Sequence, residues 1–192
     1  MKQTRSGFTI VEVALVLGIA GLIIVMAFVA LPALWASQRD ADRKSKVMEF
    51  ISDLKTYQTN NSRGALPSGT LPDPPRIYQS AVSSADATSW QGFIRDFVLA
   101  GKSFEDPGGE AYSFYIFANG CPGATSAGQA CVVNNGTIDV NNPNASINAI
   151  DSTIYVVVGA TCDEHTIVKS NNNRSVAAMQ ILEHGDRYCQ NT

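Results

Sequence analysis

The chain has 192 residues and a formal net charge of −3, with 14 Lys and Arg against 17 Asp and Glu. This length suits one modest domain and an anchoring segment. The weakly acidic balance offers no basic surface for nucleic acid, so we do not expect a nucleic-acid-binding protein.

An uninterrupted apolar stretch follows a short polar leader at the N-terminus. Residues 13–36 form this stretch, and no charge occurs between Glu12 and Arg39. As a helix its 24 residues reach roughly 36 Å, more than a hydrocarbon core of about 30 Å. A secretory signal has a shorter apolar core of about 7–15 residues and a small-residue cleavage site. We therefore expect the segment to stay in the mature protein as a transmembrane helix.

The residues in front of the apolar stretch form a motif. Residues 7–12 read Gly-Phe-Thr-Ile-Val-Glu, after a leader that contains Lys2 and Arg5. The motif resembles the prepilin motif of type IV pilins and the related pseudopilins. The resemblance covers about the first sixty residues. It implies cleavage by a prepilin peptidase between Gly7 and Phe8, and N-methylation of Phe8.

The same resemblance implies a type IV pilin-like fold and a set of partners. These are other copies of the chain and related pilins in a helical filament, the prepilin peptidase, and a membrane assembly platform with its ATPase. The precursor would lie in the cytoplasmic membrane, in contact with lipid, as a single-pass protein with its C-terminal domain outside. The processed chain would lie in a cell-surface pilus serving motility, adhesion, DNA uptake or secretion. The chain itself would not be an enzyme and would need no cofactor.

Glu12 stands at the head of the apolar stretch, where a carboxylate is costly. In a packed filament of such helices, it would pair with the free amine on Phe8 of a neighbouring copy. Each unpaired charge in apolar surroundings costs several kcal/mol, so this pair would select one axial register. The alternative is local: a glutamate in the first helical turn gains about 0.3–1 kcal/mol from the macrodipole.

We expect four parts: the leader 1–7, a hydrophobic transmembrane or filament-core helix 8–36, an amphipathic helical extension 37–61, and an extracytoplasmic domain 62–192. Pro32 interrupts the long helix and removes a backbone donor, which favours a kink or local melting when subunits pack. An ordinary tolerated transmembrane proline is the alternative. In the extension, apolar side chains recur at helical spacing. They are Val47, Phe50, Ile51, Leu54 and Tyr57.

The remaining sequence predicts one short helix and a small antiparallel sheet. The helix spans residues 90–100 and ends at Gly101. The expected strands are 112–117, 131–133 with 137–140, 153–159, 175–182 and 187–189, with residues 184–186 as the last hairpin turn. We expect antiparallel neighbours because the links are short. The fold class is thus α+β: a long N-terminal helix packed on a small antiparallel β-sheet.

Four cysteines follow the apolar stretch: Cys121, Cys131, Cys162 and Cys189. An even number placed only there indicates two disulfides in an oxidising compartment, against the alternative of four reduced, buried thiols. Three connectivities exist. We favour Cys121–Cys131, which closes a short Gly-rich loop, and Cys162–Cys189, which ties two C-terminal strands. The second pair resembles the disulfide-bounded C-terminal region of many pilins.

We expect no metal site and no catalytic site. Residues 162–165, Cys-Asp-Glu-His, offer metal-ligand types at a spacing that fits no standard zinc site. The Asn-rich residues 139–151 lack the glycine and the closing glutamate of an EF-hand loop. Two histidines and no nucleophile elbow give little support for a hydrolytic triad.

These observations favour a structural subunit of a type IV pilus-like filament. A type II secretion pseudopilin or a minor pilin is the nearest alternative, because it shares the N-terminal chemistry. The other alternative is a membrane-anchored surface binding domain that never polymerises. Such a domain would keep its leader and would not depend on Glu12.

Overall fold

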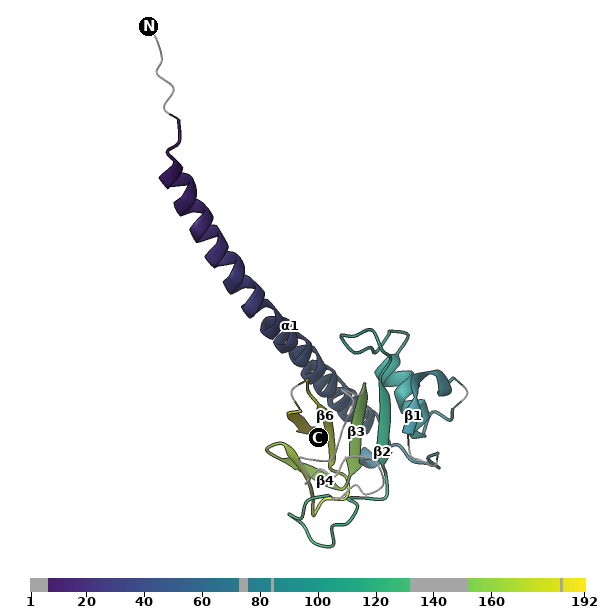
Figure 1. Ribbon diagram of the computed structural model, residues 1–192. Helices are drawn as coiled ribbons and strands as arrows, with labels where there is room; N and C mark the ends of the chain where they lie inside the picture. The colour runs from purple at the N-terminus through teal and green to yellow at the C-terminus, as the bar shows by residue number, and fades with distance from the viewer. Residues whose placement is uncertain (1–6, 73–75, 84, 132–151, 184) are drawn as a thin grey trace. The chain divides into compact units, whose positions relative to one another are not determined.

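The computed structural model describes residues 7–72, 76–83, 85–131, 152–183 and 185–192. The chain divides into two compact units, Met1–Arg39 and Asp40–Thr192, and each is considered by itself. Figure 1 shows their helices and strands.

Helix α1 (Ile10–Asn60) contributes to both units and continues through Pro32 without a break in its helical assignment. In the first unit, residues 7–35 are exposed. Among the described helices, α1 alone is long and apolar enough to cross a membrane, and none of its most apolar window is buried. The expected long apolar helix is thus confirmed, and no described residue of its own unit covers it.

In the second unit, the helical residues from Asp40 to Asn60 supply one side of the core. The apolar stripe expected there is confirmed, because each of its members is at most 5 % exposed. Phe50 lies at its centre, with its ring 5.6 Å from that of Phe93 and 5.4 Å from that of Phe114. The stripe therefore packs on both the short helix and the sheet.

The main sheet has five strands in the order β1–β2–β3–β6–β7, and β4 and β5 form a separate hairpin. The strands are β1 (Arg76–Tyr78), β2 (Ser113–Phe117), β3 (Thr153–Val158), β4 (Ala160–Asp163), β5 (Thr166–Lys169), β6 (Val176–Ile181) and β7 (Arg187–Asn191). Strands β2, β3, β6 and β7 were expected from the sequence, whereas β1, β4 and β5 were not.

The expectation of a purely antiparallel sheet is wrong, because β2 and β3 are parallel. Ser113 lies opposite Thr153, and Phe117 opposite Val157. Residues 118–152 connect the two strands, and parallel neighbours require a long crossover of this kind. The strand expected at 131–133 with 137–140 lies outside the described residues, apart from Cys131. The other pairs in the sheet are antiparallel, so the α+β layout holds with a mixed sheet.

The short helix expected at residues 90–100 is present in two pieces. An α-helical turn, α2 (Trp90–Phe93), leads into η3 (Ile94–Leu99), which has π-helical hydrogen bonding. The Ser89 side chain caps α2 by accepting a bond from the Gly92 N–H at 3.0 Å. The helix ends in the left-handed region at Ala100 (φ 40°) and Gly101 (φ 78°).

Two disulfides join Cys121 to Cys131 and Cys162 to Cys189, which are the pairs favoured from the sequence. The first closes a loop after β2. The second ties β4 to the edge strand β7 and so holds the small hairpin on the main sheet. Closing loops of these sizes contributes about 3 kcal/mol each by restricting the unfolded chain.

Gly92 in α2 lies against the backbone of the preceding loop. A Cβ placed there would stand 2.0 Å from the carbonyl oxygen of Asp86 and 2.7 Å from the Cα of Ala87. We predict that Gly92→Ala lowers the free energy of unfolding by about 3 kcal/mol, because backbone must move to admit the methyl group. Urea unfolding of the detergent-solubilised chain, followed by tryptophan fluorescence, measures this. Gly108→Ala is the matched control, since its nearest atom lies at 3.4 Å; equal stability of the two variants would contradict the prediction.

Candidate functional site

The residues predicted for processing lie immediately before α1. Gly7, Phe8 and Thr9 belong to no helix or strand and are exposed. A Cβ added at Gly7 would meet no atom within 4 Å, and Phe8 is 89 % exposed. Exposed, non-helical segments near a chain end are where proteases act most readily. The Gly7–Phe8 peptide bond is therefore in a setting that a peptidase can reach.

Thr9 and Glu12 form a reciprocal cap on the first turn of α1. The Thr9 N–H and hydroxyl each donate to Glu12 Oε2 at 2.9 Å, and the Glu12 N–H donates to Thr9 Oγ1 at 3.3 Å. This pattern is a capping box, in which Thr9 is the N-cap and Glu12 the third helical residue. The local role considered for Glu12 is therefore observed within one chain.

The cap leaves part of the Glu12 carboxylate available. Both bonds from Thr9 end on Oε2, and Oε1 accepts none from the part of the chain that the structure describes. An ionised carboxylate offers about four acceptor positions on its two oxygens. The capping role and a bond to a second chain are thus compatible. Sequence reasoning overlooked Thr9, although a threonine three residues before a glutamate, ahead of an apolar run, is the signature of this cap.

The helix surface that follows this cap is apolar from Val13 to Ala36. The exposed large apolar side chains of the first unit range from 40 % exposed at Leu31 to 89 % at Phe8. A contiguous apolar surface of this size marks a site of contact with lipid or with other proteins. Glu12 is the one acidic side chain among described residues 7–36. The first unit therefore presents an apolar rod with one carboxylate near its end.

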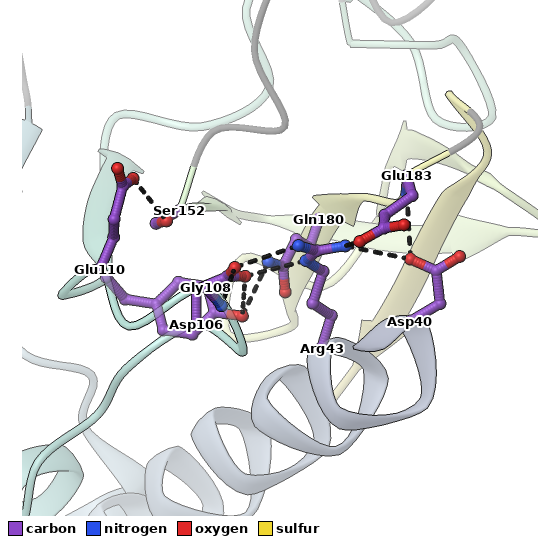
Figure 2. A network of polar contacts seen from close by, with 9 residues as sticks. Asp40, Arg43, Asp106, Gly108, Glu110, Ser152, Gln180 and Glu183 are labelled. Atoms are coloured by element: carbon purple, nitrogen blue, oxygen red, sulfur yellow. Dashed lines mark hydrogen bonds and ion pairs between the residues drawn. The ribbon is translucent and has the colours of Figure 1, made fainter. Parts of the chain in front are cut away.

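A second cluster of charged residues lies inside the second unit (Figure 2). Arg43 of α1 is 3 % exposed. Its Nε donates to one oxygen of Asp106 at 2.8 Å, and its Nη2 to the other at 3.0 Å. Its Nη1 lies 3.2 Å from Asp40 Oδ1 and 3.3 Å from Glu183 Oε1. The guanidinium thus joins the helix to the turn after residue 105 and to the end of β6.

Further hydrogen bonds support the buried carboxylate of Asp106. It accepts from the Tyr112 hydroxyl at 3.1 Å and from the Gly108 N–H at 3.1 Å. The Gln180 amide in turn donates to the Tyr112 hydroxyl at 2.9 Å. The cluster therefore reaches from α1 to the buried face of β6. Sequence reasoning missed Arg43, although a lone arginine in the register of the apolar stripe is a signal for a buried partner.

Burial and charge act oppositely on the groups of this cluster. Burial alone would raise the pKa of Asp106, but the bonds from Arg43, Gly108 and Tyr112 outweigh it and hold that pKa below its ordinary value. The bond to Asp106 raises the pKa of Arg43. Burial raises the pKa of Tyr112, which therefore stays a neutral donor. The cluster is a fixed ionic link and offers no group poised for proton transfer at neutral pH.

Two hollows open near the carboxyl ends of the parallel strands β2 and β3. One, of about 570 Å³, is lined by residues 69–72 and 116–122. The other, of about 420 Å³, includes Lys169, whose ammonium already binds the carbonyls of Ala124 and Thr125. Within the described ranges, no group of three or more His, Cys, Asp or Glu is placed to hold a metal ion.

Comparisons of the chain with family models, with curated proteins and with solved structures give no match.

Replacing Asp106 by asparagine should destabilise the second unit, because Arg43 would lose its closest ionic partner inside the fold. We predict a loss of about 3 kcal/mol at pH 7. The pKa of Asp106 is lowered in the fold, so its contribution is complete above the unfolded value near pH 4 and is lost as pH falls further. Unfolding free energies measured between pH 7 and pH 2 should therefore fall less steeply below pH ~4 in Asp106→Asn than in the parent chain.

Asp163→Asn is the control for this prediction. It removes an exposed carboxylate at the end of β4 and should change stability at pH 7 by no more than about 0.5 kcal/mol. If Asp106→Asn behaves like Asp163→Asn, the ionic link contributes nothing to the fold.

Proposed function

We propose that this chain is a structural subunit of a type IV pilus-like filament, made as a membrane-anchored precursor and processed between Gly7 and Phe8. One observation carries the proposal: an apolar helix stands uncovered in its own unit, with a single capped carboxylate, Glu12, directly after an accessible Gly7–Phe8 bond. In this proposal the chain performs no catalysis and binds no cofactor.

The apolar environment of the lipid explains the role that we propose for the Glu12 carboxylate. Lipid tails are as apolar as leucine, so apolar helices gain little by leaving lipid for one another. Association does stabilise a carboxylate near the end of an apolar helix, because a cation of the neighbouring chain offsets the cost of exposing the negative charge to hydrocarbon. Association would therefore be directed by Glu12, while the apolar side chains fill the space between helices.

Cleavage after Gly7 supplies the partner charge. The new N-terminus at Phe8 is an amine directly before the capping residue Thr9 and only four residues from Glu12. Within one chain, Thr9 already occupies Glu12 Oε2. The other oxygen is then available for the Phe8 amine of a neighbouring copy. One such pair in every subunit would set a single axial register along the filament.

The second unit suits the outside of such a filament. Its core is closed by the α1 stripe; one disulfide closes the loop after β2 and the other ties the β4–β5 hairpin to the sheet. Disulfides persist in oxidising compartments, which agrees with a domain outside the cytoplasmic membrane. The fold proposed for the whole chain is pilin-like.

Two substitutions separate the register role of Glu12 from its capping role. Glu12→Ala removes both the cap and the carboxylate, so we predict normal membrane insertion and cleavage but at least a tenfold loss from sheared surface filaments. Thr9→Ala removes the cap alone, at a cost of about 1 kcal/mol in helix stability. It should still enter filaments. Quantitative immunoblots of membrane and sheared fractions measure both; equal loss in the two variants would show that Glu12 acts only as a cap.

The accessibility of Gly7 generates a separate prediction. A side chain at this position would obstruct the close backbone approach that glycine permits. We predict that Gly7→Leu leaves the chain in the membrane with its leader attached, which intact-mass measurement detects. Efficient removal of the leader from this variant would argue against a dedicated peptidase that reads Gly7.

A further inference from the structure

Two rows of opposite charge follow α1 within the second unit. Asp42 and Asp53 form an acidic row, and Lys44 and Lys55 form a basic row. In each row the two residues are eleven positions apart, which is about three turns of an α-helix. The members of a row therefore lie within about 20° of each other around the axis and about 16 Å apart along it. The two rows have equal spacing.

The rows lie on different flanks of the helix. Asp42 and Lys44 are two residues apart and so point about 160° away from each other. The two rows divide the helix surface into two faces. One face is the buried apolar stripe of the core. The other is an exposed face of uncharged side chains, most of them small. It consists of Ala41, Ser45, Met48, Ser52, Thr56 and Thr59.

The acidic row is not neutralised within its own chain. No ion pair or hydrogen bond engages the carboxylate of Asp42 or Asp53 in the described ranges, and Asp42 is exposed. One oxygen of Asp53 is buried with no hydrogen-bond donor. Burial raises the pKa of Asp53, against the opposing charge of Lys102. The Asp53 side chain is half-buried, and a cation from outside the chain would favour its ionised form.

The neighbouring charges of the helix are, by contrast, already paired. Glu49 binds both Lys46 and Lys102, and Arg43 is held inside the fold. In the basic row, Lys55 is exposed and Lys44 lies 6.0 Å from the centre of the Tyr188 ring. Neither lysine meets a carboxylate among the residues described. The four residues of the two rows are therefore the charges that this helix leaves for a partner.

We propose that the acidic row of one copy docks on the basic row of a neighbouring copy, so that the occupant of this surface is a second copy of the chain. This inference rests on the proposed function, because apolar anchors in one membrane hold neighbouring helices parallel. Between parallel helices, equal spacing lets both pairs form together. A shift of two residues, about 3 Å, brings Asp42 opposite Lys44 and Asp53 opposite Lys55.

The interface is heterologous, because its two sides use different flanks of the same helix. In a docked pair, one copy keeps its basic row free and the other keeps its acidic row free, so association continues into an open array instead of stopping at a dimer. Opposite charges on the two flanks also disfavour docking of like flanks.

Carbodiimide coupling tests this contact in membranes that hold the full chain. The reagent joins a carboxylate to an amine in direct contact. Side chains two residues apart on a helix do not face each other, so an Asp42–Lys44 or Asp53–Lys55 bridge requires two copies. We expect ladders of covalent multimers on denaturing gels, with these bridges identified by peptide mass spectrometry.

Charge reversal supplies the decisive variants. Asp42→Lys with Asp53→Lys makes both flanks basic, and Lys44→Asp with Lys55→Asp makes both acidic. Each double variant should reduce the ladder about fivefold or more. The quadruple variant exchanges the rows, retains the net charge and restores opposite flanks, so its ladder should return to the parental level. Urea unfolding of each variant verifies that the second unit is folded, and the parental cross-link map does not depend on any variant.

The possible outcomes distinguish this inference from the function on which it rests. Filaments in the sheared fraction without Asp–Lys bridges between the rows would overturn the docking of the rows and leave the filament proposal standing. Failure of the quadruple variant to recover, with its fold intact, would overturn it as well. Absence of both filaments and multimers would overturn both proposals.

Discussion

The uncovered apolar half of α1 is the constraint on which the rest of the account depends. Its side chains from residue 10 to residue 35 are exposed, and no described residue of its own unit covers them. Water is a poor solvent for such a surface, so it must lie in lipid or against other chains. In the proposed function, lipid would cover this surface in the precursor and neighbouring copies would cover it in the filament.

In the proposed filament, charged side chains would select the axial register between neighbouring helices, which the apolar side chains alone do not select. Apolar helices slide past one another at little cost, because each register buries similar side chains. Glu12 would fix the register at the apolar end of the helix, and the acidic and basic rows would do so in the second unit. Arg43 has a different role, because its ion pairs with Asp106 and Glu183 lie inside its own fold and connect the helix to the rest of the second unit.

The sequence predicted the features that arise from long, strongly periodic patterns. The apolar run, the amphipathic stripe and the β-branched run of β3 each determine an element with little help from distant residues. Gly101 marked the end of the short helix. The number and position of the cysteines indicated two disulfides, and the pairing favoured among the three connectivities is the one observed.

Other features depended on contacts that a linear pattern does not record. The β4–β5 hairpin was missed because its turn places Glu164 at φ 51°, where glycine or asparagine would have signalled a turn. Strand β1 was missed because it has only three residues and follows a proline-rich loop. The parallel pairing of β2 and β3 was missed because residues 118–152 were expected to include an intervening strand.

At the candidate site, the pattern indicated Gly7, Phe8 and Glu12, whose spacing along the chain is sufficient to mark them. The spacing of Thr9 and Glu12 was also a sequence signal, but it was overlooked until the structure showed the hydrogen bonds of the cap. The partners of Arg43 needed the structure. The Arg43 cluster joins residues that are 63 and 140 positions apart (43 to 106 and 43 to 183), a separation over which no local pattern acts.

The most direct test of the central claim is the intact mass of the chain recovered from filaments sheared off the cell surface. A processed filament subunit should begin at N-methylated Phe8 and gain the mass of four hydrogens when its two disulfides are reduced. A chain that begins at Met1 and occurs only in the membrane fraction would contradict the central claim. That result would indicate an anchored surface domain and would remove the role assigned to Glu12 between subunits.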